Sequence, residues 1–404
     1  MMVCRFDQKY LKFNLKKFIS GYKEEDILDD HCQQFCNQWL SFLGIQPHKT
    51  LTLHSAFNYL ILIFTLAVWM YTYLEMKHGD STEALHRICL SLLALGLFSI
   101  QFFKHEEIMS VAKQIDDCFS YSNSDVKPFF KRRQKDLFTS GMKIYTDLFT
   151  IIVFTTWGSI LANLYKEQLF VADVKPPIPM ILPIESKFLH YFVYFSETCF
   201  VVIASIADVL MAHLFMMFTL QLTANFEVLC LNLNSMNRFM KNDLALVLDS
   251  EIMPKIKVNI RHHQEIFKSF NSIKKLFDQI FYILYFSMMS AIAMCRTLLV
   301  GDIDIKHLLP LFYLETGYIH IFCHFADMLA EESANVRIAA YSTPWYTFSS
   351  NVCTSLRIMV IRALKPPKLY FFIGGSDISC ATFTLILNAS VTYFCISIMM
   401  ENQN

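Results

Sequence analysis

Long apolar segments alternate with polar ones along most of this chain. Each apolar segment is about 20 residues long, the length that an α-helix needs to cross the hydrocarbon core of a bilayer. The pattern therefore predicts an all-α, polytopic membrane protein with seven transmembrane helices. The predicted spans are residues 55–74, 85–103, 144–164, 188–218, 277–300, 308–329 and 378–400.

Two of the polar connections also have a helical pattern. Between Asp249 and Phe277, apolar residues recur every three or four positions with Lys and Arg between them, which indicates an amphipathic helix running into the fifth span. Residues 352–364 have a second such stripe. Together with the overlong fourth segment, these helices predict a cytosolic packing domain, the anchor, formed by about residues 219–276 and 330–373 of a chain that is otherwise a single unit.

A break separates the anchor from the last span. Gly374 and Gly375 disfavour helix, and Ser376 or Asp377 is expected to cap the helix that follows. The seventh helix is thus predicted to be split into a cytosolic half and a membrane half.

The distribution of Lys and Arg gives the orientation. The segments that would lie on the side of the N-terminus carry 27 of these residues, and those on the other side carry five. The positive-inside rule then places the N-terminus in the cytosol and the C-terminus outside the cell. This orientation is the inverse of that of G-protein-coupled receptors.

Composition narrows the function. The chain is 54% hydrophobic and 17% charged, against roughly 25% charged residues in a soluble protein. Its net charge of zero gives no reason to expect a nucleic-acid partner, and it lacks the common nucleotide-binding and hydrolase motifs, so neither an enzyme nor a cofactor is expected. None of the 12 cysteines falls in the short outer loops; Cys32 and Cys36 after His31 imitate a metal site, but ordinary thiols are expected there.

The last span carries a stripe of residues spaced by four. Asn388 and Thr392 lie on its inner part, and Ile396 and Met400 lie at its outer end. A polar stripe in hydrocarbon must face protein or water. The stripe either makes helix-to-helix hydrogen bonds or lines a pore with an apolar constriction, which would require several subunits.

Aromatic and small residues crowd the outer halves of three spans and are candidates for a small-molecule pocket. Lipid-facing aromatic belts would give the same composition. The candidates are Phe154, Trp157, Gly158, Leu161, Tyr191, Phe195, Thr198, Cys199, Tyr313 and Gly317.

Ionisable residues within the spans leave a second class of function open. Arg296 and Glu315 flank one short loop, where they either form an ion pair or Arg296 extends to the headgroups. An ion-coupled secondary transporter would also carry such charges, but the two halves of the chain show no repeat.

The C-terminal third resembles the closing signature of insect odorant receptors. Elsewhere the resemblance rests on length, seven spans and inverted topology. The matching positions are Glu332, Ser333, Ala340, Tyr341, Trp345, Tyr346, Arg362, Lys365, Pro366, Thr382, Phe383 and the run from Val391 to Phe394.

The resemblance implies an odorant-gated, non-selective cation channel in the plasma membrane of sensory neurons, with no metal and no cofactor. Family members form tetramers whose split seventh helix lines the pore, which places the gate at Ile396 and Met400. A small neutral volatile would bind within each subunit, at the level of the outer leaflet and between spans two to six, while membrane lipids and permeant cations are further partners. Met399 stands where gustatory receptors and the shared co-receptor typically carry Gln. The chain is therefore expected to be a ligand-tuning subunit that forms a heterotetramer with the co-receptor; a gustatory-type channel and a transporter are the alternatives.

Overall fold

The computed structural model describes residues 36–37, 40–41, 43–45, 52–75, 81–118, 187–236, 249–300, 305–371 and 375–401. Apart from an isolated bridge between Tyr370 and Asp377, these residues form helices and loops and contain no strand. The all-α prediction is thus confirmed. The predicted third span, residues 144–164, lies outside the described residues.

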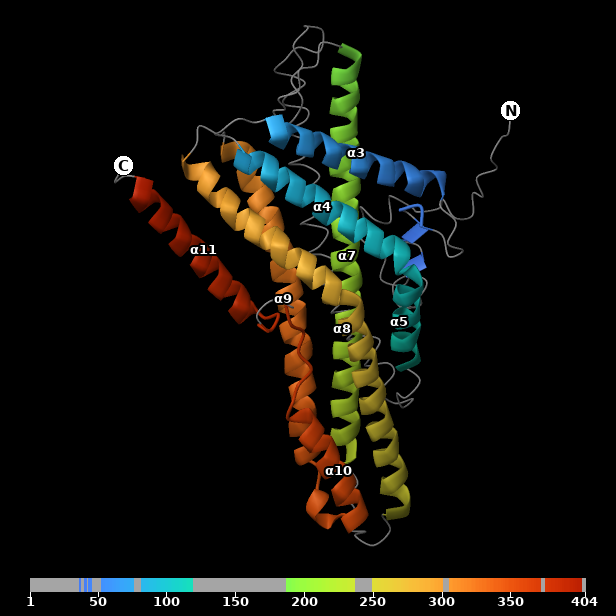
Figure 1. Ribbon diagram of the computed structural model, residues 1–404. Coiled ribbons are helices and arrows are strands. Elements are labelled where there is room, and N and C mark those ends of the chain that lie inside the picture. The colour runs from blue at the N-terminus through green and yellow to red at the C-terminus, as the bar shows by residue number, and fades with distance from the viewer. Residues whose placement is uncertain are drawn as a thin grey trace, which may run out of the picture.

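Three long helices run through the length of the molecule (Figure 1): α7 (Lys187–Ser235), α8 (Asp249–Val300) and α9 (Ile305–Tyr341). With 49 residues and a rise of 1.5 Å per residue, α7 is roughly 70 Å long, more than twice the ~30 Å thickness of a bilayer core. The amphipathic 249–277 segment continues into the predicted fifth span without interruption. These helices therefore project beyond the membrane, as their sequences predicted.

Two further helices lie across one end of this trio (Figure 1). They are α3 (Leu53–Glu75) and α4 (Ser81–Phe103), which match the first two predicted spans. A short amphipathic helix, α5 (His105–Cys118), follows α4 directly and was not predicted. It packs on α8, where the Cys118 thiol lies 3.3 Å from the Ser269 hydroxyl.

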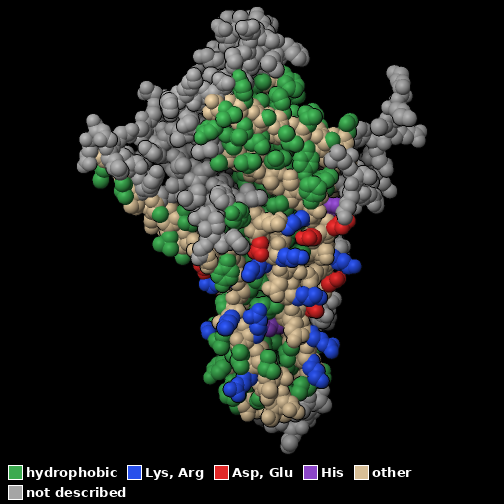
Figure 2. Space-filling model, in the orientation of Figure 1, with side chains coloured by type: hydrophobic (Ala, Val, Ile, Leu, Met, Phe, Trp, Pro, Cys, Tyr) green, Lys and Arg blue, Asp and Glu red, His purple; other side chains and the backbone are tan. Residues whose placement is uncertain are grey.

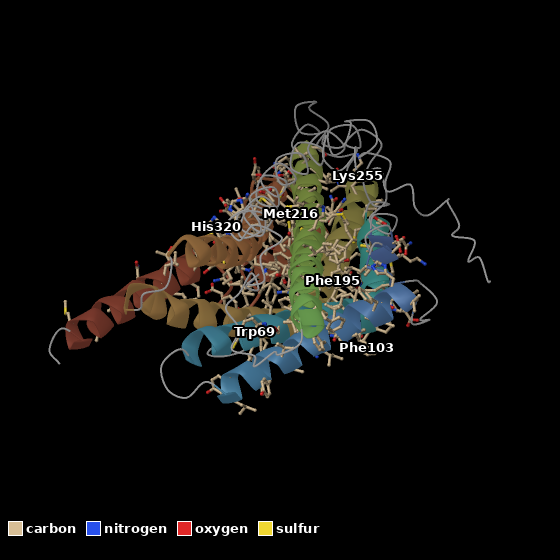
Figure 3. All side chains as sticks on the ribbon, turned by 90° about the horizontal axis from the view of Figure 1, so that it is seen from above. Trp69, Phe103, Phe195, Met216, Lys255 and His320 are labelled. Atoms are coloured by element: carbon tan, nitrogen blue, oxygen red, sulfur yellow. The ribbon has the colours of Figure 1, made fainter. Side chains whose placement is uncertain are left out.

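Aromatic side chains fill the middle of the three long helices. Phe215 of α7 lies 5.1 Å from Phe277 of α8 and 4.6 Å from Phe322 of α9, measured between ring centroids, and all three rings are fully buried. Each such pair contributes about 0.5–1.5 kcal/mol beyond its buried area. Figure 3 shows the neighbouring Met216 on α7 at the centre of the bundle when it is viewed from above. This cluster ties α7, α8 and α9 into one unit.

The surface is divided along the long axis of the molecule. Figure 2 shows hydrophobic side chains covering the described upper part, whereas Lys, Arg, Asp and Glu gather on the lower part. Among the described residues, the segments Leu53–Tyr71 and Val202–Ser235 are long and apolar enough to cross a membrane. The large apolar side chains that α3 and α4 expose suit lipid rather than water; they include Leu53, Leu60, Ile63, Leu74, Leu92 and Phe103.

The last two helices are separate elements. Helix α10 (Ser350–Ala363) follows the short 3-10 turn η3 (Trp345–Thr347) at the charged end, and α11 (Cys380–Glu401) lies at the edge of the molecule (Figure 1). Helix α11 packs mainly on α9 and α8. The seventh element is thus split, as the sequence predicted.

Candidate functional site

The exposed face of α11 carries the predicted pore stripe. Asn388 and Thr392 are exposed, and the side chain of Ile396 is 51% exposed. The Thr392 hydroxyl donates to the Asn388 carbonyl over 2.8 Å, so its donor is satisfied within the helix and its oxygen still faces outward. The side chain of Met400 lies outside the described part. On the part of the subunit that the structure describes, Asn388, Thr392 and Ile396 are left open, which suits contact with water or with another subunit.

A small hairpin connects the anchor to α11. The Phe371 amide donates to the Ser376 carbonyl at 2.9 Å, and the Ile378 amide donates to the Leu369 carbonyl at 2.8 Å. Gly375 turns the chain with φ of +66°, a conformation that glycine adopts readily. Because Leu369, Phe371 and Ile378 are buried, the hairpin holds the base of α11 against the core.

The cap of α11 differs from the sequence prediction. The Ser379 hydroxyl, rather than Ser376 or Asp377, accepts the amide of Thr382 at 3.2 Å. Asp377 instead forms an ion pair with Lys368 at 2.6 Å. The Lys368 ammonium holds the pKa of the Asp377 carboxyl below its usual value. Both side chains are partly exposed to solvent, so the pair fixes the shape of the hairpin more than it adds stability.

A polar and aromatic cluster joins three helices in the anchor. His262 of α8 contacts the side-chain oxygen of Asn225 of α7 at 3.0 Å. The ring of His263 lies 4.9 Å from that of Phe267, measured between centroids. The Arg362 guanidinium of α10 lies over the Phe267 ring, 3.9 Å from its centroid. Burial lowers the pKa of both histidines to about 4. The neighbouring His263 ring lowers the pKa of His262 further, and the Arg362 guanidinium does the same for His263. Both imidazoles are therefore neutral near pH 7.

The anchor also exposes an apolar face. Large side chains at the end of α9, in η3 and along one side of α10 are open to solvent, while α10 buries a different stripe within the subunit. An apolar face of this kind at the charged end of a protein is typical of a protein interface. Its members, called the outer anchor face below, are Ile338, Tyr341, Trp345, Tyr346, Ile358, Ile361 and Leu364.

The predicted ligand residues are only partly described. Phe195 is 55% exposed on α7 (Figure 3), while Cys199, one turn further on, and Gly317 of α9 are half-buried. The remaining members lie outside the described residues or have side chains outside the described part; they are Phe154, Trp157, Gly158, Leu161, Tyr191, Thr198 and Tyr313. The ligand pocket therefore stays a prediction.

Three other predictions from the sequence concern residues or properties that the structure describes only in part. The side chains of Arg296 and Glu315 lie outside the described part, so their pairing stays a prediction. Cys36 is buried as a free thiol, while His31 and Cys32 lie outside the described residues. The distribution of Lys and Arg predicted which side of the membrane each connection faces. Helix positions alone do not test this orientation, so it also stays a prediction.

Long helices that are apolar at one end and charged at the other, with a last helix at the periphery, define a polytopic helical membrane protein. A model of the family described as 7tm Odorant receptor matches residues 82–391, which is most of the chain. The chain belongs to the insect odorant receptor family. Members of this family are receptors with a seven-span helical fold, which agrees with the long helices described above.

Relatives match over shorter stretches. The odorant receptor coreceptor of Ooceraea biroi is 33% identical over 88 residues, 21% of this chain and 18% of that protein. Odorant receptor 10 of Aedes albopictus is 25% identical over 139 residues, 33% of this chain and 36% of that protein. The match thus spans well under half the length of either relative.

Solved structures share the fold over nearly the whole chain. The insect olfactory receptor OR5 from Machilis hrabei superposes with a TM-score of 0.71 at 12% identity, covering 90% of this chain and 96% of that one. The same receptor in complex with eugenol gives 0.74 at 11% identity, covering 95% and 100%. At such identities the likeness concerns the fold alone.

Proposed function

We propose that this chain is the odorant-binding subunit of a heteromeric, ligand-gated, non-selective cation channel in the plasma membrane of olfactory neurons. Its ligand is a small neutral volatile, and its channel partner is the odorant co-receptor. The observation that carries the proposal is the exposed stripe on α11, in a chain that belongs to the odorant receptor family.

The stripe suits a pore wall. Asn388 and Thr392 would provide a wet inner section, and Ile396 would stand at an apolar constriction nearer the outer mouth. Apolar rings can stop ions by expelling water, without any fixed charge. Since one helix cannot enclose a pore, the stripe supports a complex in which each subunit contributes one copy of this helix.

The outer anchor face supports such a complex. It would give neighbouring subunits an apolar surface to pack against outside the bilayer, where burial of apolar area stabilises association. Several relatives that match the chain are co-receptors, which favours a partner of the same fold. Met399, at a position where the co-receptor typically has Gln, supports a tuning rather than a co-receptor role.

The chemistry of the ligand follows from the predicted outer pocket. Its candidates are aromatic, aliphatic or small and include no charged side chain, so they suit a neutral molecule with one or two polar groups. A structurally similar receptor has been solved with eugenol, which is of this general kind. Esters, alcohols, aldehydes and terpenes form a suitable panel.

Whole-cell recording tests this function. Cells expressing the chain with a co-receptor, and cells expressing either one alone, would be exposed to the panel. We expect a volatile-evoked, non-selective cation current that gains its ligand preference only when this chain is present. Substrate uptake coupled to an ion, with no ligand-gated current, would support the transporter alternative instead.

A further inference from the structure

The base of α11 is tied to α9 by one side chain. A carboxylate oxygen of Asp327, on α9, accepts the backbone amide of Cys380 at 2.7 Å. Cys380 is the first residue of α11 and lies 53 positions further along the chain. The first amides of a helix have no partner within it, and a carboxylate there also interacts favourably with the helix dipole. Asp327 therefore acts as an end cap donated by a different helix.

This tie is additional to the helix's own cap. The Ser379 hydroxyl already accepts the Thr382 amide, so α11 could begin without Asp327. The role of the hydrogen bond between Asp327 and the Cys380 amide is therefore to fix where α11 starts relative to α9, because the helix is already capped by Ser379.

A second contact joins the same two helices further along. The ring of His320 lies 5.2 Å from that of Phe383, and Figure 3 shows His320 on the side of α9 from which α11 extends. His320 and Asp327 are seven residues apart, which is about 10 Å or two turns along α9. Two contacts at this spacing hold the direction of α11 as well as its position.

Helix α9 also reaches the region proposed for the ligand. It is continuous from Ile305 to Tyr341, and the candidate pocket residue Gly317 lies ten positions, roughly 15 Å, before Asp327. A ligand can shift the channel only by stabilising one arrangement over another. A continuous helix that touches both the pocket and the base of α11 can pass such a shift from one to the other.

We propose that Asp327 is a positioning residue that couples ligand-driven movement of α9 to the pore helix α11. The inference rests on the proposed function, since it assumes that α11 lines a pore opened by a volatile. The mechanical link between α9 and α11 is the hydrogen bond from the Cys380 amide to the Asp327 carboxylate.

Variants can remove this bond from either side. Asp327→Ala removes the acceptor, whereas Asp327→Asn keeps an oxygen that can accept the amide. Cys380→Pro removes the donor at a helix position where proline is well tolerated, and Cys380→Ala keeps the amide but loses the thiol. Glu331→Ala, an exposed carboxylate one turn further along α9, is the matched control for charge.

The readout is the maximal current evoked by the most effective panel volatile, divided by surface expression and by the response to a direct co-receptor agonist. We expect Asp327→Ala and Cys380→Pro each to lower this ratio about tenfold, the effect of losing roughly 1.4 kcal/mol of coupling. Asp327→Asn, Cys380→Ala and Glu331→Ala should stay within about twofold of wild type. The double variant Asp327→Ala with Cys380→Pro should be no worse than either single change, because both remove one bond.

Two results would overturn the inference. One is a wild-type ratio for both Asp327→Ala and Cys380→Pro at normal surface expression. The other is an equal loss in Cys380→Ala, which would assign the effect to the thiol. A wild-type complex that reaches the surface and answers the co-receptor agonist but no volatile would contradict the proposed function instead, so the two failures can be told apart.

Discussion

The guanidinium of Arg362 lies 3.9 Å from the ring centroid of Phe267 and so joins α10 to α8 within the anchor. Arg362 is also one of the positions by which the C-terminal third resembles insect odorant receptors. A position of this motif thus corresponds to a packing contact between two helices. The charged guanidinium itself lies over the face of the ring, which is the geometry of a cation–π contact.

Loss of this contact should weaken the anchor slightly. A cation over an aromatic ring contributes about 0.5–1 kcal/mol at an exposed site. We expect Arg362→Gln to lower the thermal unfolding temperature of the detergent-solubilised protein and Arg362→Lys to lower it less. Arg357→Gln, an exposed arginine of the same helix, is the control. Equal shifts for Arg357→Gln and Arg362→Gln would show that general charge, rather than the ring contact, is responsible.

Acid should destabilise the anchor through the two buried histidines. Their pKa values are lowered to about 4 from 6.5, so the unfolded chain binds protons more readily than the folded one between these values. Stability from this source is therefore complete above about pH 6.5 and is lost as the pH falls toward 4. At 1.36 kcal/mol per pKa unit, the full loss is about 3 kcal/mol per histidine.

The variant His263→Phe isolates this effect, because it keeps an aromatic ring beside Phe267 and cannot be protonated. Its melting temperature should fall less than that of wild type between pH 6.5 and 5. His324→Gln, at an exposed position of α9, should follow wild type. Parallel pH profiles for His263→Phe and wild type would remove His263 as the cause.

Crowding the predicted pocket should weaken the ligand response. Gly158→Leu adds a bulky side chain among the aromatic candidates of the third span, so we expect a higher half-maximal concentration of volatile. Surface expression and the response to a co-receptor agonist should be unchanged. If Gly158→Leu and matching changes at Phe195 and Gly317 all leave the concentration dependence intact, the pocket lies elsewhere.

Polar substitutions at the predicted constriction should make the channel leak. Ile396→Asn and Met400→Gln would each let water remain in a section that apolar side chains otherwise dry. We expect a larger current without ligand or a changed ion preference. The effect should be partial, because co-receptor subunits contribute their own residues to the same ring. Unchanged basal current, selectivity and block in both variants at normal surface expression would argue that the stripe is a packing surface.

Hydropathy and amphipathic spacing were sufficient to predict most of the helices, because the bilayer and the core impose simple periodic patterns. They located α3, α8 and α10 to within a few residues. Helix α5 escaped prediction because it is short and polar, although Ile108, Val111 and Ile115 carry the spacing that could have revealed it.

The details around α11 depend on contacts between distant residues. Local rules pointed to Ser376 or Asp377 as the cap, whereas Ser379 caps the helix and Asp327 is brought to it from α9. No spacing in the sequence relates Asp327 to Cys380, because their proximity follows from the packing of two helices. The same limit applies to the pocket, whose candidates come from three separate spans.

The central claim is that α11 lines a water-filled pore, and the accessibility of Thr392 tests it most directly. Thr392→Cys, expressed with the co-receptor, would be exposed to a small positively charged thiol reagent during recording; wild type and Ile386→Cys, which packs against the core, are the controls. We expect the reagent to reduce the volatile-evoked current of Thr392→Cys irreversibly, faster with ligand present than without it, and to leave both controls unaffected. Full volatile-evoked current from Thr392→Cys after prolonged exposure to the reagent, with ligand present throughout, would contradict the claim.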